Sequence, residues 1–386
     1  MRYCFYVPDQ LPALYQLGIV GAGQMARLIY QAALKFGITP RLLAEGIEDS
    51  AAQAAPDAYF AHPDTLAALA EYCEVLTFEH DRLDLGLLQM LERNGTVVRP
   101  GIKVMRAAFD KLHQRRVLSN RNFPVPPFVE AQSPDDLFDF ASEHGFPLVL
   151  KSARSGPPGT RNLWIVDTRS EMLRVSAEQG DRKILVEAHQ DILKELVVLV
   201  ARRPGGSSRS YPVIETVMRN GTCTEVHYPA DVGPRVAAEA QAIATRVADE
   251  LDAVGILAVE FFLSTDGLMI NEIAARPHNA GHPTIEAGPT SQFENHVRAV
   301  LDLPLGPTWT SCPAAVTINV IGGIGGVDPA NHLPTALAIE GAQIHLYGKR
   351  PLPGRKLGHV TAIADDIEQA RDLARRAEAA LQGSRL

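Results

Sequence analysis

The sequence has few cysteines and no long apolar run, and each absence excludes a class of protein. The four cysteines, Cys4, Cys73, Cys223 and Cys312, lie far apart and form no Cys-x-x-Cys pair. This spacing argues against a zinc site or a disulfide framework and favours reduced thiols in the cytoplasm. No uninterrupted apolar run reaches the roughly 18–20 residues that span a bilayer, so no membrane association is expected.

Concentrated positive charge is also missing. The chain has 37 Lys and Arg residues against 45 Asp and Glu residues, a formal net charge of −8. An acidic chain without a basic run is a poor candidate for binding nucleic acid. Residues 1–16 lack the charged start, apolar centre and cleavage site of a signal peptide, and we interpret them as an extension before the first strand.

The length and the residue pattern favour a multidomain α/β protein. At roughly 100–200 residues per domain, 386 residues correspond to two or three domains. The first hundred residues alternate short apolar runs with helical periodicity, which favours a parallel sheet. A helix is predicted over residues 103–120, an antiparallel strand pair over 195–201 and 211–217, and a long helix over 234–251.

A glycine turn follows the first predicted strand. Gly21-Ala-Gly23-Gln24-Met25-Ala26 matches a dinucleotide fingerprint, and Glu45 at the end of the next strand could accept a ribose hydroxyl. Phosphates and other small polar ligands bind at similar turns, because helix-start amides face outward. A tight turn without a ligand is the remaining alternative.

A predicted hairpin carries two carboxylates. Asp266-Gly267 is a hairpin-turn signal, and a turn at this position places Glu260 opposite Glu272 on one face. Two such carboxylates repel unless a cation lies between them, and Mg²⁺ bound with nucleotide phosphates is the natural occupant. Asn271 could add a neutral oxygen. Two exposed carboxylates on an edge hairpin are the alternative.

Three further segments carry candidate site residues. A polar loop after the hairpin contains Arg276, His278, Asn279 and His282, which suits anion binding; the alternative is a loop whose polar groups bond one another. A turn-rich segment places Lys349, Arg350, Arg355 and Lys356 within eight residues, which suits a substrate phosphate or is a solvated basic loop. Lys151 ends an apolar strand beside the Gly/Pro-rich segment 155–160 and could reach nucleotide phosphates, or it is an ordinary strand-end lysine. Glu187 and Glu195 are candidate acceptors for ribose hydroxyls.

Together these motifs resemble the ATP-grasp superfamily and, within it, the N5-carboxyaminoimidazole ribonucleotide synthetase family. The resemblance covers residues 17–360. It is most specific over residues 271–282 (NEIAARPHNAGH), 291–294 (SQFE) and 354–359 (GRKLGH), with support from residues 21–25 and 77–79. It implies an α/β ATP-grasp fold: a Rossmann-like domain over residues 1–100, an ATP-grasp domain of two subdomains over 101–302, and a β-rich domain over 303–386. It also implies a homodimer.

The resemblance implies an ADP-forming ligase that uses ATP and Mg²⁺. In this reaction bicarbonate attacks the γ-phosphoryl group of ATP to give carboxyphosphate. That species, or CO2 released from it, carboxylates the amine of 5-aminoimidazole ribonucleotide. The implied roles are as follows: metal ligands Glu260 and Glu272; ATP contacts Arg115, Lys151, Glu187, Glu195 and Asn271; substrate contacts Gln24, Glu79, Arg276, His278, Asn279, Lys349, Arg355 and Lys356, of which Arg276, His278 and Lys356 are also catalytic.

Two departures from the family pattern leave alternatives open. Residues 155–161 read SGPPGTR where the family usually has Gly-Gly-Tyr-Asp-Gly-Lys/Arg-Gly, and Arg115 replaces a lysine. Prolines stiffen a phosphate-covering loop and remove an amide donor. The alternatives are a diverged ligase that joins another carboxylate to an amine through an acyl phosphate, a nicotinamide-dependent oxidoreductase, and a nucleotide-binding module without turnover.

Overall fold

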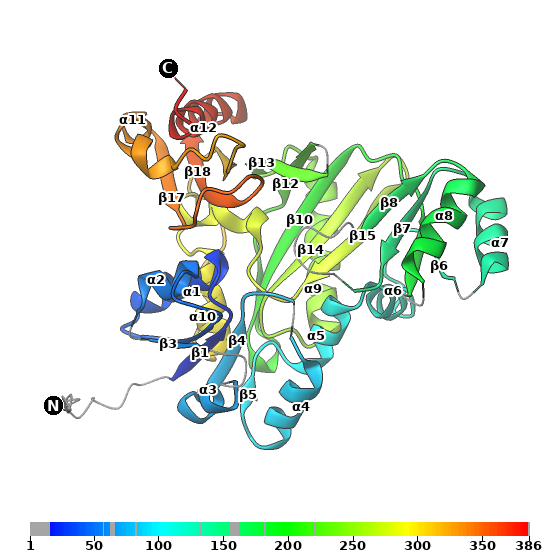
Figure 1. The fold of residues 1–386 in the computed structure, drawn as a ribbon, viewed down its shortest axis with the longest axis horizontal. Coiled ribbons are helices and arrows are strands. Elements are labelled where there is room, and N and C mark those ends of the chain that lie inside the picture. Colours follow the sequence, from blue (N-terminus) through cyan, green and yellow to red (C-terminus); the bar gives the residue numbers. More distant parts are fainter. Residues whose placement is uncertain are drawn as a thin grey trace.

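The structure is a computed structural model of the 386-residue chain. It describes residues 16–384, apart from residues 57, 62–65, 82, 132, 155–161, 181–182 and 220. The altered segment 155–161 and most of the N-terminal extension therefore lie outside the described residues. Within the described residues, the strands form three sheets (Figure 1).

The first sheet confirms the Rossmann-like prediction. Five parallel strands lie in the order β3-β2-β1-β4-β5. Their bounds are β1 Leu17–Val20, β2 Arg41–Ala44, β3 Tyr59–Ala61, β4 Val75–Phe78 and β5 Val97–Val98, with helices α1 Gln24–Leu34, α2 Ser50–Ala54, α3 Leu66–Tyr72 and α4 Leu85–Arg93. Gly21 directly follows β1 and has a φ of +100°, a conformation that favours glycine. Helix α1 begins three residues later.

The helix predicted over residues 103–120 is wrong as a single element. The structure has α5 Ile102–Phe109 and α6 Lys111–Ser119, separated by Asp110 in an extended conformation. The Asp110 carboxylate accepts a hydrogen bond from the amide of His113 and so starts a second helix. An aspartate at this position favours an N-cap over a helix interior.

A second sheet is small and antiparallel. Its strands lie in the order β6-β9-β7-β8 and carry Lys151 on β7 and Glu187 on β9. The bounds are β6 Phe128–Glu130, β7 Leu148–Ser152, β8 Leu163–Val166 and β9 Ile184–Ala188, with helices α7 Pro134–His144 and α8 Arg169–Gln179. Apolar residues of both helices and of the sheet form one core cluster.

The third sheet is the largest and is built from antiparallel pairs. Its order is β15-β14-β10-β12-β13-β16-β18-β17, with β11 paired to β10. The bounds are β10 Lys194–Arg202, β11 Ser208–Ser210, β12 Ile214–Arg219, β13 Thr222–Tyr228, β14 Gly255–Ser264, β15 Gly267–Ala274, β16 Ala314–Ile321, β17 Ala342–Leu346 and β18 Lys356–Ala364. The strand predicted over 211–217 therefore begins later, at Ile214.

Helices and 3₁₀ turns complete the molecule. They are α9 Pro234–Glu250, α10 Gln292–Val300, α11 Leu333–Leu337 and α12 Ile367–Leu381, with η2 Pro204–Gly206, η3 Asn279–Ile285 and η4 Pro329–His332. None of the helices in the described part of the chain has the length and apolar content that crossing a bilayer requires. The predicted domain boundaries stay predictions. Strands β13 and β16 lie on opposite sides of the predicted boundary between residues 302 and 303, and they pair within one sheet.

The two faces of the large sheet differ in chemistry. One face packs under α9 and α5 in an apolar cluster that includes Leu196, Val198 and Val259. The opposite face carries the acidic residues, because Glu260 pairs with Glu272 across β14 and β15, and Glu195 pairs with Phe262, two residues beyond Glu260. Glu195, Glu260 and Glu272 therefore share one face.

Candidate active site

The predicted carboxylate pair lies on a bulged hairpin. Glu260 and Glu272 are direct cross-strand partners, as the turn at Asp266-Gly267 predicted, and the register shifts between Glu260 and Phe261. The shift makes Asn271 the extra residue of a β-bulge, and a bulge re-aims the side chains beside it. The Asn271 amide thereby reaches the same face and donates to Glu260 Oε2 at 3.2 Å.

A buried cluster of charged side chains supports this bulge, with Lys151 and Glu187 from the small sheet and Arg115 from α6. Lys151 Nζ lies 2.6 Å from Glu187 Oε2 and donates to Asn271 Oδ1 at 3.0 Å. The guanidinium of Arg115 bonds the carbonyl oxygens of Ile270 and Asn271 at 2.7 and 2.8 Å and also pairs with Glu187. Burial alone would raise the pKa of Glu187, but Lys151 and Arg115 hold the pKa below its usual value.

Each metal-candidate carboxylate has a cationic or ionisable neighbour. Lys111, the first residue of α6, donates to Glu272, and His278 Nε2 lies 3.2 Å from Glu260 Oε1. Burial opposes ionisation of Glu260, but its contacts with His278 and Asn271 hold its pKa below the usual range. Burial and the nearby charge of Glu260 raise the pKa of Glu195. Glu195 therefore lies close to the negative charge of Glu260, and a cation between them would relieve this repulsion.

The polar loop after β15 is held in place by residues from other elements. Arg276 forms a two-pronged ion pair with Asp81, with its Nη2 at 2.7 Å from Oδ2. Gln292 on α10 accepts from the His278 amide at 2.8 Å and donates to the His278 carbonyl at 2.6 Å. Among the described residues, the half-buried Asn279 has no partner for its Oδ1. The loop is therefore fixed at its backbone while Asn279 keeps an acceptor available.

A carboxylate occupies the glycine turn. Glu79 follows β4 and accepts from the amides of Gly23 and Ala26 at 2.6 and 3.3 Å. A Cβ at Gly21 or Gly23 would lie 2.4 to 2.6 Å from Glu79 atoms, so the glycines here make room for Glu79. The amides that would bind a dinucleotide pyrophosphate are engaged by a negative side chain. This geometry argues against the nicotinamide alternative.

A cavity of about 600 Å³ opens beside this turn and brings predicted substrate residues together. Glu79, Lys349 and Arg355 line it, and Glu45 also lies on its wall. Lys349 Nζ donates to Gln24, and burial lowers the pKa of Lys349 to about 8. Burial also lowers the pKa of Lys356.

The cationic side chains of residues 349–356 do not all lie at this cavity. Arg350 lies at the surface and pairs with Glu48 at 3.3 Å, away from the cavity. The four cations grouped by the sequence therefore do not all face one ligand. Lys349 and Arg355 are the two that line the cavity.

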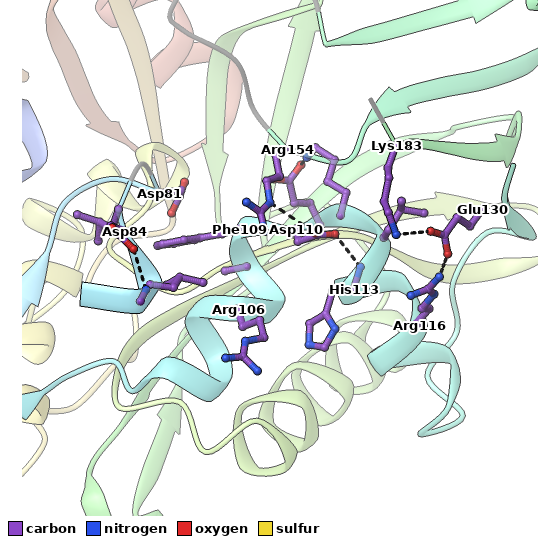
Figure 2. Close-up of a pocket in the computed structure, with 17 residues that line it drawn as sticks. Asp81, Asp84, Arg106, Phe109, Asp110, His113, Arg116, Glu130, Arg154 and Lys183 are labelled. Atoms are coloured by element: carbon purple, nitrogen blue, oxygen red, sulfur yellow. Dashed lines mark hydrogen bonds and ion pairs between the residues drawn. The ribbon is translucent and has the colours of Figure 1, made fainter. Parts of the chain in front are cut away.

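A second cavity, of about 800 Å³, adjoins the carboxylate hairpin (Figure 2). Lys111 and Glu272 lie on its wall together with Asp81. Figure 2 shows Lys183 and Arg116 directed toward Glu130, and the Lys183–Glu130 separation is 3.0 Å. This cavity connects the Rossmann-like domain, the paired helices α5 and α6, and the small sheet.

The sequence analysis missed several residues that the structure places at the site. Lys111, Asp81 and Gln292 contact Glu272, Arg276 and His278 respectively. The helix-capping aspartate at position 110 was a signal for a break just before Lys111. The other two contacts join segments 195 and 14 residues apart, and no local pattern indicates them.

Three family models match successive parts of the chain. A ribonucleotide synthetase preATP-grasp domain matches residues 14–108, an ATP-grasp domain residues 116–293, and a phosphoribosylaminoimidazole carboxylase C-terminal domain residues 315–373. The N5-carboxyaminoimidazole ribonucleotide synthase of Mycobacterium tuberculosis H37Rv is 40% identical over 375 residues, covering 94% of this chain and 86% of the relative. That of Corynebacterium ammoniagenes is 34% identical and covers 95% and 91%.

Solved structures agree with the sequence relatives. The Thermus thermophilus N5-carboxyaminoimidazole ribonucleotide synthetase has a TM-score of 0.85 and 32% identity, covering 94% of this chain and 97% of that one. The Aspergillus clavatus enzyme, in complex with ADP and 5-aminoimidazole ribonucleotide, has a TM-score of 0.87 and 29% identity, with 96% and 99% covered. The predicted three-part fold is therefore confirmed, and the chain belongs to the N5-carboxyaminoimidazole ribonucleotide synthase family of ATP-grasp enzymes.

Proposed function

We propose that this chain is an ADP-forming carbon–nitrogen ligase that carboxylates 5-aminoimidazole ribonucleotide with bicarbonate. The observation that carries the proposal is the facing pair Glu260 and Glu272 on a bulged hairpin, with Lys151 beside it and a separate cavity whose wall includes Lys349 and Arg355. A nucleotide and a phosphorylated acceptor can thus be bound in one structure. The extent of the match to N5-carboxyaminoimidazole ribonucleotide synthases supports this substrate pair.

The residues present fit Mg²⁺ and ATP. Glu260, Glu272 and Asn271 supply hard oxygen donors, and Mg²⁺ usually takes one or two carboxylates together with phosphate oxygens and water. When bound, Mg²⁺ would neutralise charge on the transferring phosphoryl group.

We assign the ATP-facing roles to the cluster under the bulge. Lys151 supplies a cation for the phosphates, and Glu187 and Glu195 are proposed to accept from the ribose or to orient Lys151. The predicted ATP contact of Arg115 stays a prediction, because its buried guanidinium bonds two carbonyl oxygens and Glu187. In its present position Arg115 holds the backbone that presents Asn271.

The acceptor is proposed to bind across the cavity at the glycine turn. Its phosphate lies against Lys349 and Arg355, since charge-assisted bonds to Lys and Arg favour phosphate. Its sugar hydroxyls donate to Glu79 and bond Gln24. Arg276, His278 and Asn279 then border the reacting end, and Arg276, His278 and Lys356 stabilise negative charge there.

The reaction has two balanced steps. A bicarbonate oxygen attacks the γ-phosphorus of ATP, the bond to ADP breaks, and carboxyphosphate forms. The amine nitrogen of the acceptor then attacks the carboxyl carbon and loses a proton, and phosphate leaves. Positioning and charge stabilisation supply most of the catalysis in phosphoryl transfer, and a closed site protects the mixed anhydride from water.

The test is ADP release by the purified protein with Mg-ATP in CO2-depleted buffer. Aminoimidazole ribonucleotide and bicarbonate are added singly and together. Release that requires both substrates supports the proposal. ATP binding without release would contradict it and favour the diverged ligase, which the prolines at 157 and 158 suggest, or a module without turnover; screening of other amines and carboxylates separates these two.

We further propose a cytoplasmic homodimer. The dimer rests on the family resemblance, and the location rests on the use of ATP and on the free thiols found among the described residues, Cys73, Cys223 and Cys312. Light scattering coupled to size-exclusion chromatography tests the dimer: a mass near 84 kDa, twice the 41.9 kDa of the chain, is expected. Fractionation of the cells that make the protein tests the location.

A further inference from the structure

Three histidines and a tyrosine meet where the parts of the molecule join. His282 lies on η3, His345 on β17, His359 on β18, and Tyr347 directly after β17. The rings of His282 and His359 stack at 4.3 Å with an interplanar angle of 4°, and His345 stacks on the other side of His359 at 4.4 Å. We refer to His282, His359 and Tyr347 as the junction cluster.

The Tyr347 hydroxyl joins the two buried histidines. It lies 2.6 Å from His359 Nδ1 and 3.4 Å from His282 Nε2. Burial lowers the pKa of both histidines well below the ordinary value, so each ring is neutral and has one N–H and one lone pair. One hydroxyl can therefore donate to one ring and accept from the other.

The junction cluster reaches the substrate cavity through Lys349. Lys349 Nζ lies 5.6 Å from the centroid of the Tyr347 ring, within the range of a cation–π contact, and donates to Gln24. The backbone carbonyl of Tyr347 accepts from Ser50 Oγ at 2.6 Å, and the ring belongs to the apolar core of the Rossmann-like domain. Tyr347 thus touches the Rossmann-like domain, the η3 loop and Lys349 together.

Stability alone does not explain these histidines. His282 Nδ1 and His359 Nε2 have no hydrogen-bond partner among the described residues, although the side chains are 1% and 0% exposed. A buried polar atom without a partner lowers the stability of the fold. An apolar pair would pack here without that cost but could not bond the Tyr347 hydroxyl, as His359 Nδ1 and His282 Nε2 do.

We propose that the junction cluster positions Lys349 for the phosphorylated acceptor, with the Tyr347 hydroxyl, held by His282 and His359, fixing the ring beneath the ammonium group. These are positioning residues, because they reach the substrate through Lys349. The inference rests on the proposed function, since it assigns the acceptor phosphate to Lys349.

The first test is Tyr347→Phe, which keeps the ring and removes the hydroxyl. The KM for aminoimidazole ribonucleotide should rise about fivefold, the size expected for one lost neutral hydrogen bond, while kcat and the KM for ATP stay within about twofold. The matched control is Tyr211→Phe. Tyr211 is equally buried, and its hydroxyl bonds Thr290 and Asn295 at 3.1 and 2.8 Å. It should lower the Tm without changing either KM.

The second test uses the different ring nitrogens that the two histidines present. Asparagine places its amide where Nδ1 lies and glutamine where Nε2 lies. His359→Asn should therefore retain the low KM better than His359→Gln, and His282→Gln better than His282→Asn. If the histidines have only a structural role, the KM of each variant should follow its Tm, and the opposite Asn and Gln preferences at His359 and His282 should not appear.

The outcomes separate the inference from the function on which it rests. If the unaltered protein releases no ADP in response to aminoimidazole ribonucleotide, the proposed function fails. If that protein is active but Tyr347→Phe leaves the KM unchanged, or raises it no more than Tyr211→Phe does, the positioning role is refuted. If a histidine variant does not fold, Tyr347→Phe decides the matter alone.

Discussion

Lys349 combines low solvent access with a position in the substrate cavity. Burial lowers its pKa to about 8, so its positive charge disappears within an accessible pH range. A phosphate monoester has its second pKa near 6 and stays dianionic above pH 7. A change in the KM for the acceptor above pH 7 therefore reflects the titration of a group on the protein and not that of the phosphate.

We expect the KM for aminoimidazole ribonucleotide to be constant up to about pH 7.5 and to rise between about pH 8 and 9.5, because neutral Lys349 no longer attracts the phosphate. Lys349→Arg keeps its charge over this range and should remove the rise. Steady-state kinetics at fixed ionic strength measure the effect. The same rise in both proteins would show that another group titrates.

Glu272 provides a second prediction for a single residue. Glu272→Gln keeps the shape but removes the charge that Mg²⁺ requires. ADP release should fall at least about 100-fold, which corresponds to about 2.7 kcal/mol, and half-saturation should need more Mg²⁺. Asp266→Asn removes an exposed carboxylate from the turn of the same hairpin and serves as the control. Equal losses in both variants would argue against a metal at Glu272.

The bulge in β15 is the element that organises the candidate nucleotide site. Its carbonyl oxygens are held by Arg115, and its Asn271 side chain bonds Lys151 and Glu260. A bulge has no strong sequence signal, and the predicted pairing of Glu260 with Glu272 left the direction of Asn271 open. The register shift settles this question, because it turns two successive side chains toward one face.

Removal of the Arg115 side chain tests this support. Arg115→Met leaves two backbone carbonyl oxygens without their buried donor and leaves Glu187 with Lys151 as its cation, and each buried polar group that loses its partner costs roughly 1–3 kcal/mol. Urea unfolding should show a decrease of this order in the free energy of unfolding. Arg121→Ala breaks an exposed pair with Glu250 and should change it by less than about 1 kcal/mol. Similar values for both would show that Arg115 is dispensable.

At the scale of the whole molecule, a buried histidine joins two domains. His296 on α10 accepts from the Ile256 amide through Nδ1 at 3.1 Å, and its Nε2 lies 2.8 Å from Thr77 Oγ1 on β4. Burial lowers the pKa of His296 to about 3, from an ordinary value of 6.5. Between these values the unfolded chain binds a proton that the folded chain does not bind, so stability falls as the pH falls.

We expect the free energy of unfolding to decrease as the pH drops below about 6.5, with a contribution from His296 that approaches roughly 4–5 kcal/mol near pH 3. His282 and His359 add to the same trend. Urea unfolding between pH 7.5 and 4.5 measures the slope. His296→Gln should flatten it and His189→Gln, at an exposed position, should not; an unchanged slope in the first variant would contradict the assignment.

The sequence by itself determined the chemistry and the local elements of this protein. The glycine turn, the Asp-Gly hairpin and the opposed glutamates follow from short-range rules of turn geometry and strand alternation, so they were predictable. Tertiary structure decided what those elements face. Glu79 in the glycine turn, Lys111 beside Glu272 and Asp81 on Arg276 join residues 56, 161 and 195 positions apart. Such contacts arise from the packing of whole domains, which no periodicity within one segment encodes.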